Sequence, residues 1–367
     1  MREDMNWKFE LEEYIKQGEP EKAEKSEAWQ TAIGLQAVDG LRTSEYLLET
    51  AKAHIEGKIS IDAAQKRIQS YYEEREKRGE IEDEAREADV VSSRIAAILG
   101  EKTFQFSPAE WQEIHRRLFD GVLDGAGKIR PYNITKKEWV LKGDTVLYAS
   151  YESIRATLDY DFNREKQFSY KGLSILESVK HIAEFTSGIW QIYPFCEGNT
   201  RATAVFIIKY LKTFGFQVNN EVFAANSWYF RNALVRANYN NLRNGVYATT
   251  IYLELFFENL LLDKHHDLKN RYLHLEYHSD TGEKTVQSAG EDISKGKKCT
   301  LNCTLDELVL LKIIKQEPTI TQKELALKVG KSERTIKKRT IELQEKGYIR
   351  RLNGKRNGRW EVLCELM

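Results

Sequence analysis

Proline is scarce in this chain, and the scarcity limits the fold more than any other feature of the sequence. Only five of the 367 residues are proline, a residue that ends or kinks a helix because it lacks a backbone N–H and clashes with the preceding turn. Long stretches instead repeat apolar residues at helical spacing, as Leu41, Tyr46, Leu47 and Ala51 do. We therefore predict a mainly α-helical protein.

The chain is long enough for more than one hydrophobic core. Single cores rarely grow beyond about 250 to 300 residues, and 41% of this sequence is apolar. From about Glu276 to Thr300 the sequence is polar, contains Gly and Ser and shows no periodicity, which is typical of a linker. We predict domain boundaries that separate residues 1–84, 85–265, 266–300 and 301–367.

Charge cancels over the whole chain. There are 56 basic and 56 acidic residues, so the net charge indicates neither a nucleic acid nor a membrane partner. The start, MREDMNWKFELEE, is charged from the second residue, and no apolar run approaches the ~20 residues of a membrane span. We expect a cytoplasmic protein without a membrane partner.

The last part of the sequence predicts three short helices and a hairpin. LDELVLLKIIKQ is amphipathic, TITQKELALKVG ends at a glycine, and SERTIKKRTIELQEKGYI begins at a serine cap. RRLNGKRNGRWEVL then predicts two strands. This order resembles a winged helix-turn-helix domain over residues 301–367.

Positive charge is concentrated in this domain. Residues 331–360 hold eleven Lys and Arg against three Glu, a net charge of +8. A cationic recognition helix and wing suit phosphate contact and entry into the major groove. The resemblance implies double-stranded DNA as a partner, although a winged helix with solvated lysines that binds proteins is the alternative. The candidate DNA-binding residues are Arg334, Lys337, Lys338, Arg339, Lys355 and Arg356.

A second motif lies in the middle of the chain, in the stretch IWQIYPFCEGNTRATAVF at residues 189–206. It resembles the Fic family signature, His-Pro-Phe-x-(Asp/Glu)-Gly-Asn-x-Arg, which joins two helices. The resemblance extends upstream through EIHRRLFDGVLDGAGKIRPYNI and covers roughly Ala85 to Leu262. It implies a Fic-type helical bundle for residues 85–265, and the expected fold is therefore mainly α, with a C-terminal winged helix.

Fic proteins transfer AMP from ATP to a hydroxyl group on a target protein, so the resemblance implies ATP and Mg²⁺ as cofactors. Gly198 and Asn199 would present backbone amides to the phosphates at a helix start. Arg201 would bind the β- or γ-phosphate, and Glu197 would bind Mg²⁺. The alternative is an ordinary Gly-Asn helix start with a surface ion pair.

Tyr193 departs from the signature. Family members have a histidine here, which takes the proton from the incoming hydroxyl, whereas a phenol has a reference pKa of about 10 and is a poor base at neutral pH. We predict that ATP binding is retained and that AMP transfer is slow or absent, since losing a general base typically costs about 10²- to 10⁴-fold. Two alternatives are that Tyr193 itself accepts AMP, or that it fills space in an inactive site.

The resemblance also implies a flap for the target protein and a pocket for adenine. In residues 138–148, WVL and TVLY flank Lys-Gly-Asp, which predicts a projecting β-hairpin. In Fic proteins this flap pairs with the target segment, here through Trp139, Val140 and Leu141, although the hairpin could instead pack on its own core. Further on, SWYFRNALVRANYN makes Phe230 a candidate for stacking on adenine and Asn238 for reading its edge.

Residues 1–84 resemble the antitoxin-like helical module of some Fic proteins. Its Ser/Thr-x-x-x-Glu-Gly motif obstructs the γ-phosphate site, but the corresponding frame here is LQAVDG, from Leu35 to Gly40. Asp39 replaces the glutamate, and Ala204 stands where many members carry the arginine that pairs with it. We expect a structural module in which Asp39 is the remaining candidate for inhibition.

Zinc-type ligands lie outside the resemblance. His274 and His278 are four residues apart on an expected helix, and Cys299 and Cys303 follow. The spacing is loose, and surface histidines are the commoner explanation of such a pair.

Three functions stay open at this level. The first is a nucleotide-binding Fic protein with weak or altered AMP transfer, and the second is a catalytically inactive protein that senses a nucleotide and acts through its DNA-binding domain. The third is a transcriptional regulator whose Fic fold forms a homodimer.

Overall fold

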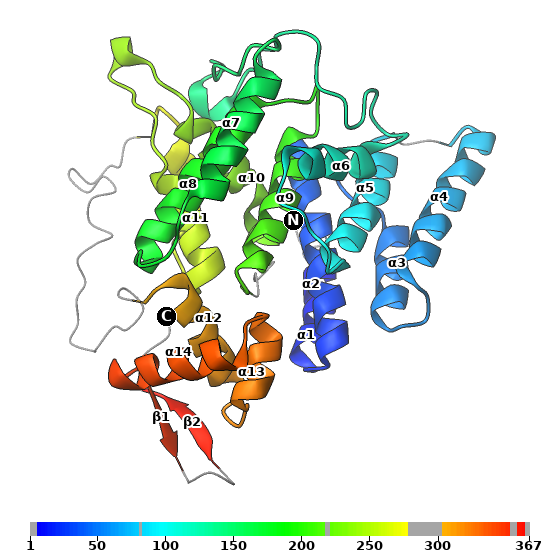
Figure 1. Cartoon of the computed structure of the whole chain (residues 1–367). Helices are drawn as coiled ribbons and strands as arrows, with labels where there is room; N and C mark the ends of the chain where they lie inside the picture. Colours follow the sequence, from blue (N-terminus) through cyan, green and yellow to red (C-terminus); the bar gives the residue numbers. More distant parts are fainter. Residues whose placement is uncertain (1–5, 81–82, 217–220, 278–302, 353–357, 364–367) are drawn as a thin grey trace.

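The computed structural model describes residues 6–80, 83–216, 221–277, 303–352 and 358–363. These residues are mainly helical, as predicted (Figure 1). Across the described part of the chain, no helix combines the length and the apolar character that a membrane crossing requires. The N-terminal elements are α1 (Asn6–Lys16), α2 (Pro20–Gly34), the 3₁₀ helix η2 (Leu35–Asp39), α3 (Glu45–Ile55), α4 (Ile61–Arg78) and α5 (Asp83–Gly100).

The central body is a bundle built around one buried helix, α9. Polar caps begin the helices beside it: the Ser107 side chain accepts from the amide of Glu110 in α6, and Ser174 forms a capping box with Glu177 in α8. The central elements are α6 (Pro108–Phe119), η3 (Trp139–Leu141), α7 (Ile154–Gln167), α8 (Ile175–Ile192), α9 (Asn199–Thr213), α10 (Glu221–Ala237), η4 (Leu242–Asn244), α11 (Ile251–Leu262) and η5 (Asn270–Leu273).

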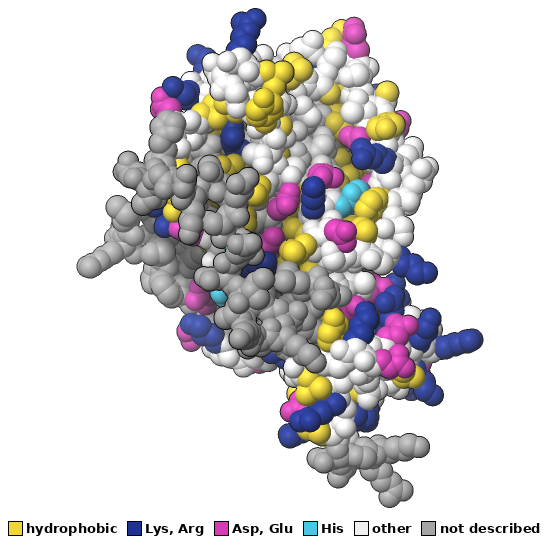
Figure 2. All heavy atoms as spheres, turned by 90° about the vertical axis from the view of Figure 1, so that its left-hand side faces the viewer, with side chains coloured by type: hydrophobic (Ala, Val, Ile, Leu, Met, Phe, Trp, Pro, Cys, Tyr) yellow, Lys and Arg dark blue, Asp and Glu magenta, His cyan; other side chains and the backbone are white. Residues whose placement is uncertain are grey.

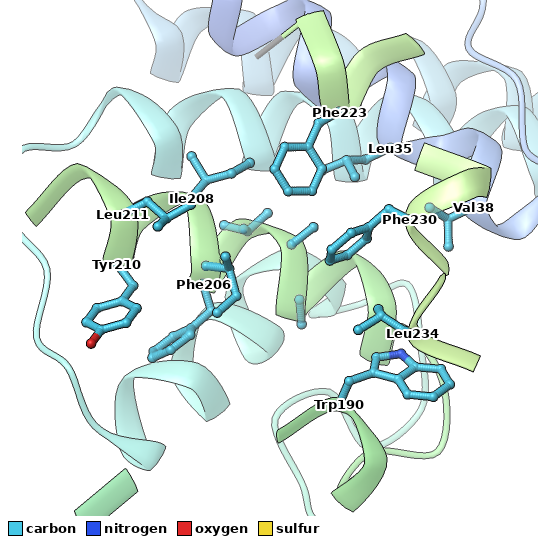
Figure 3. Packing of buried hydrophobic residues seen from close by; sticks show 14 of the residues in the cluster. Leu35, Val38, Trp190, Phe206, Ile208, Tyr210, Leu211, Phe223, Phe230 and Leu234 are labelled. Carbon is cyan, nitrogen blue, oxygen red and sulfur yellow. The ribbon is translucent and has the colours of Figure 1, made fainter. Parts of the chain in front are cut away.

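Helix α9 is buried at every position from Asn199 to Leu211. A helix surrounded on all sides is the centre of its bundle, and α9 packs against α5, α6 and α8. Figure 3 shows Phe206 and Ile208 of α9 among apolar side chains from other elements, including Phe223 of α10. The residues at the start of α9 are therefore held by the core itself.

The C-terminal domain has the predicted order of three helices and two strands. The elements are α12 (Leu305–Gln316), α13 (Gln322–Val329), α14 (Glu333–Glu345), β1 (Ile349–Leu352) and β2 (Arg359–Val362). The two strands are antiparallel, with Ile349 opposite Val362. A small separate core joins the helices to the wing and includes Leu311, Ile336 and Trp360.

Helix α12 also packs on the central body. Its residues Leu305, Leu308 and Val309 belong to the large core, and the Lys312 ammonium donates to the carbonyl of Leu261 at 2.8 Å. The winged-helix domain is therefore seated on the ends of the central helices (Figure 1).

The predicted hairpin at residues 138–148 is wrong. The only strand pair in the described residues is the C-terminal one, and residues 139–141 form the 3₁₀ turn η3 instead. Val140 and Leu141 are buried, and the amide of Leu275 donates to the carbonyl of Val140 at 3.0 Å. The runs that suggested strands are too short to make a ladder, and the burial of Val140, Leu141, Val146 and Tyr148 holds the segment on the body. Val140 and Leu141 are therefore not exposed to a target, whereas Trp139 is 50% exposed.

The N-terminal module is laid tightly on α10. A Cβ atom on Gly34 would lie 2.3 Å from the Cα of Ala224, and the Ser227 hydroxyl donates to the carbonyl of Gly34 at 2.7 Å. Only glycine lets the two backbones approach this closely. The contact holds η2, which carries Asp39, against the start of α9.

We predict that Gly34→Ala destabilises the protein by about 1–3 kcal/mol, because overpacking forces the two backbones apart. Gly100→Ala is the matched control, since a Cβ there meets nothing within 4 Å. Urea unfolding followed by circular dichroism measures both. Equal midpoints for the two variants would contradict the close approach.

Candidate functional site

The loop from Tyr193 to Gly198 joins α8 to α9 and has a defined shape. Tyr193 ends α8 with φ 49°, and Gly198 begins α9 with φ 71°. The Asn199 side chain accepts from the amide of Phe195 at 3.0 Å and donates to the carbonyl of Phe195 at 2.8 Å. Asn199 therefore clamps the loop with its amide group, and only its backbone N–H can serve the predicted phosphate contact.

Only glycine fits at position 198. Its backbone is in the left-handed region, and a Cβ atom would lie 2.4 Å from the Phe119 ring. The loop can therefore approach α6 only because residue 198 has no side chain.

Arg130 fixes the backbone at the start of the loop by hydrogen bonds, a role that the sequence did not predict. Its guanidinium is buried and donates to the carbonyl oxygens of Tyr193 at 2.8 Å and Tyr132 at 2.5 Å, and to that of Ala149. The last carbonyl oxygens of a helix have no partner within the helix, and at the end of α8 the buried guanidinium of Arg130 supplies the hydrogen bond. Arg130 lies in the stretch that carries the family resemblance, but only the contacts reveal its role.

His115 is a second support that the sequence did not reveal. Its Nδ1 accepts from the amide of Gly127 at 2.9 Å, so its Nε2–H donates to the carbonyl of Glu197 at 2.9 Å. The ring stacks on Phe195, with 3.7 Å between ring centroids. Burial lowers the pKa of His115 to about 4, so the imidazole is neutral at physiological pH, and both of its ring nitrogens are engaged in hydrogen bonds.

Arg201 is almost fully buried and is held by Asp39 of the N-terminal module and by Glu87 of α5. Its guanidinium forms ion pairs with Asp39 at 2.7 Å and Glu87 at 2.6 Å, and it donates to Gln36 at 3.0 Å. The Phe119 ring lies under it, with the guanidinium carbon 4.8 Å from the ring centroid. The structure therefore brings Asp39 to Arg201, and it adds Glu87 and Gln36, which the sequence analysis did not propose.

Tyr193 lies in a buried aromatic pocket. Its side chain is only 3% exposed and packs on Tyr148, with 4.4 Å between ring centroids. Burial raises the pKa of Tyr193, although the nearby Lys136 and Arg231 oppose the shift. The phenol is therefore protonated at neutral pH and cannot accept a proton from an alcohol.

Glu197 is exposed at the rim of the loop. Within the described residues, no group of three or more His, Cys, Asp or Glu side chains could hold a metal ion. A single carboxylate nevertheless suits Mg²⁺, which usually takes one or two carboxylates and completes its shell with phosphate oxygens and water. Glu197 is thus compatible with a metal that arrives with a nucleotide.

The zinc prediction cannot be followed in full, because His278 and Cys299 lie outside the described residues. Cys303 is buried, and His274 follows the 3₁₀ helix η5 with an extended backbone, so the expected helix is not present at this position. The His274 ring packs against Trp139, with 4.8 Å between ring centroids.

The two adenine candidates are engaged within the protein. Phe230 is fully buried and packs on Phe223 and Phe256 (Figure 3), so stacking on a base would require this cluster to open. The Asn238 amide donates to the carbonyls of Ser187 and Leu234, which leaves its carbonyl oxygen as the group for a ligand. Phe230 is thus a residue of the hydrophobic core.

The recognition helix α14 presents cations to solvent. Arg334, Lys337 and Lys338 are exposed, whereas Arg339 pairs with Asp306 of α12 at 2.9 Å and helps to hold the domain together. Lys355 and Arg356 lie outside the described residues. Figure 2 shows Lys and Arg side chains gathered over the lower part of the molecule, where this domain lies.

Comparison with known families agrees with this geometry. Residues 105–211, which include α6, α8, most of α9 and the loop with Tyr193, match the Fic/DOC family. Residues 307–350 match a family described as winged helix-turn-helix DNA-binding. No curated protein matched the chain. The chain therefore contains a Fic/DOC domain and, C-terminal to it, a winged helix-turn-helix domain.

Proposed function

We propose that this protein binds ATP with Mg²⁺ through its Fic/DOC domain and transfers AMP to protein hydroxyl groups slowly or not at all. The observation that carries the proposal is the guanidinium of Arg201, which is buried at the start of α9 and holds the carboxylate of Asp39. A guanidinium that binds a carboxylate presents the N–H geometry that also binds phosphate. The Asp39 carboxylate thus stands in for a phosphate group.

The surroundings of Arg201 suit a polyphosphate. The start of α9 carries unpaired backbone amides and the positive end of the helix dipole, both of which attract anions. Glu197 lies at the rim of the same loop and would hold the metal. Bound with Mg²⁺, ATP would supply the AMP group and a polyphosphate leaving group.

Tyr193 limits the chemistry rather than the binding. AMP transfer requires the target hydroxyl to lose its proton, and a buried, protonated phenol does not take it. The anion-binding groups do not depend on that proton, because Arg201 and the helix amides stay in place. Binding and transfer are therefore separable in this protein.

The N-terminal module would regulate nucleotide access. Asp39 and Glu87 neutralise Arg201 before any ligand arrives, and the Asp39 side chain is 38% exposed, whereas that of Glu87 is 23% exposed. A phosphate competes more readily with the more exposed carboxylate. Asp39 is therefore the residue that we assign to inhibition.

Asp39→Asn should tighten Mg-ATP binding by about 10-fold, because a neutral amide competes weakly with phosphate for Arg201. Isothermal titration calorimetry with the full chain measures the affinity. Asp62→Asn, at an exposed position in the first turn of α4, is the matched control and should bind like the parent. Weaker binding by the Asp39 variant would contradict an inhibitory role.

Tyr193→His should raise AMP transfer by about 10²-fold or more, since it restores a general base with a pKa near neutrality. Transfer is followed with ATP labelled on the α-phosphate and Mg²⁺, by counting label in protein. Tyr193→Phe is the control and should match the parent, because the phenol contributes no base. A parent that transfers label as fast as the histidine variant would show that another group accepts the proton.

A second function, DNA binding, is favoured by the family match of residues 307–350 and by the exposed cations of α14. Duplex DNA should bind with an affinity that falls with salt, with a slope of about −0.9 for each phosphate contact in a log–log plot. Replacing Arg334, Lys337 and Lys338 together by Gln should reduce that slope by about 2 to 3. Fluorescence anisotropy at several salt concentrations gives the slope.

The control for this experiment removes the same charge elsewhere. Lys166, Lys171 and Lys180 are exposed on the Fic/DOC domain, and their triple Gln variant should leave the slope unchanged. Equal loss in both triple variants would mean that net charge alone attracts DNA, and a flat salt response of the parent would exclude phosphate binding by α14.

A further inference from the structure

Lys136 is a charged residue of the site to which the family signature assigns no role. It lies in the extended segment between α6 and α7, ahead of η3, and it is half-buried. Its ammonium lies over the Tyr193 ring, 5.3 Å from the ring centroid. The side chain thus reaches into the site from a part of the chain distant in sequence from the loop.

The carboxylates near Lys136 are bound to other cations. Asp39 forms its ion pair with Arg201 at 2.7 Å, and Glu138 forms one with Arg231 at 2.9 Å. Among the described residues, the ammonium of Lys136 therefore has no carboxylate of its own. Its described contact is with the ring of Tyr193.

A partly desolvated ammonium without a counter-charge is costly. Burial favours the neutral amine, but the Tyr193 phenol and the Asp39 carboxylate outweigh it and raise the pKa of Lys136. The group therefore stays charged in the folded protein. A charged amine also cannot act as a general base, so Lys136 does not replace the missing histidine.

The negative charge of Asp39 links Lys136 to the surroundings of Arg201. Arg201 binds Asp39 directly, and the charge of Asp39 also acts on Lys136 and on Tyr193. An anion in the place of the Asp39 carboxylate would thus contact Arg201 and be attracted by the charge of Lys136. An ammonium has three N–H donors, so the contact with Tyr193 leaves Lys136 with donors for such an anion.

We propose that Lys136 is a phosphate-binding residue of the nucleotide site, which acts together with Arg201 on the phosphate that displaces Asp39. The proposal rests on the proposed function, because it assigns a further residue to the same site. It gives the phosphate a second cation in a chain where Ala204 occupies the position at which many Fic proteins carry a further arginine. The ring of Tyr193, over which the ammonium lies, would keep Lys136 in place.

The test compares Mg-ATP, inorganic pyrophosphate and adenosine as probes in calorimetric titrations of the full chain. Lys136→Gln should weaken Mg-ATP and pyrophosphate binding by about 10- to 100-fold, the usual effect of losing a hydrogen bond from a charged donor. Adenosine binding should not change, because it has no phosphate. Lys137→Gln is the matched control, since Lys137 is the exposed neighbour and should have no effect.

A second substitution tests whether the charge of Lys136 is what matters for phosphate binding. Lys136→Arg keeps the charge and should restore most of the affinity, which a purely structural role of Lys136 would not predict. Thermal unfolding of each variant shows whether it is folded. Equal losses for adenosine and pyrophosphate in Lys136→Gln would overturn the proposal, because they would indicate a collapsed pocket instead of a lost phosphate contact.

The outcomes also separate this inference from the proposed function. If Arg201→Gln abolishes Mg-ATP binding while Lys136→Gln binds like the parent, the role of Lys136 is wrong and the nucleotide site stands. If neither the parent nor Asp39→Asn binds Mg-ATP, both proposals fall together.

Discussion

The ion pairs of the Arg201 guanidinium are the interaction on which the rest of the structure depends. One buried cation joins the start of α9 to Asp39 in η2 and to Glu87 in α5. Removing one member would leave a desolvated charge without its partner, which is strongly destabilising. The contact that closes the candidate site is therefore also the contact that fixes the N-terminal module on the Fic/DOC domain. In the proposed function, nucleotide binding and the docking of that module would compete for the same guanidinium.

Helix α9 connects this cation to the DNA-binding domain. Near its end, the ammonium of Lys209 donates to the carbonyl of Ile98, and that of Lys212 donates to the carbonyl of Leu99, so α9 holds the end of α5. Just beyond α9, a Cβ on Gly215 would touch Val309 of α12, at 3.2 Å. The winged helix therefore packs beside one end of α9, and the loop with Tyr193 leads into the other end of the same helix. Because packed interiors transmit strain, α9 is a physical connection between the two regions.

The proposed function separates two capacities that Fic chemistry normally joins. Anion binding needs donors and positive charge, which we propose are supplied by Arg201, the start of α9 and Lys136. Proton transfer needs a base with a pKa near neutrality, and Tyr193 and His115 both fail that requirement because burial moves their pKa values away from it in opposite directions. If the proposed function holds, the Fic/DOC domain would bind a nucleotide without consuming it, and the exposed cations of α14 would be available to transmit that state to DNA.

The sequence by itself determined the features that depend on local pattern. Scarce prolines and helical periodicity predicted a mainly helical chain, and the glycine at position 330 and the serine cap at position 332 placed the ends of helices in the winged domain. The motif that ends in Arg201 predicted the Fic/DOC domain. These predictions succeeded because hydrogen bonds within a helix and its caps join residues only three or four positions apart.

Only the tertiary structure decided which partners the functional residues have. It placed Glu87 on Arg201 and Lys136 on Tyr193, it gave Arg130 and His115 their supporting roles, and it folded residues 138–148 onto the body instead of into a flap. Phe230, a candidate for adenine by its position in the sequence, became part of the core. The physical reason is that burial and ion pairing depend on which distant segments meet, and a periodic pattern shows that a face is apolar without showing what covers it.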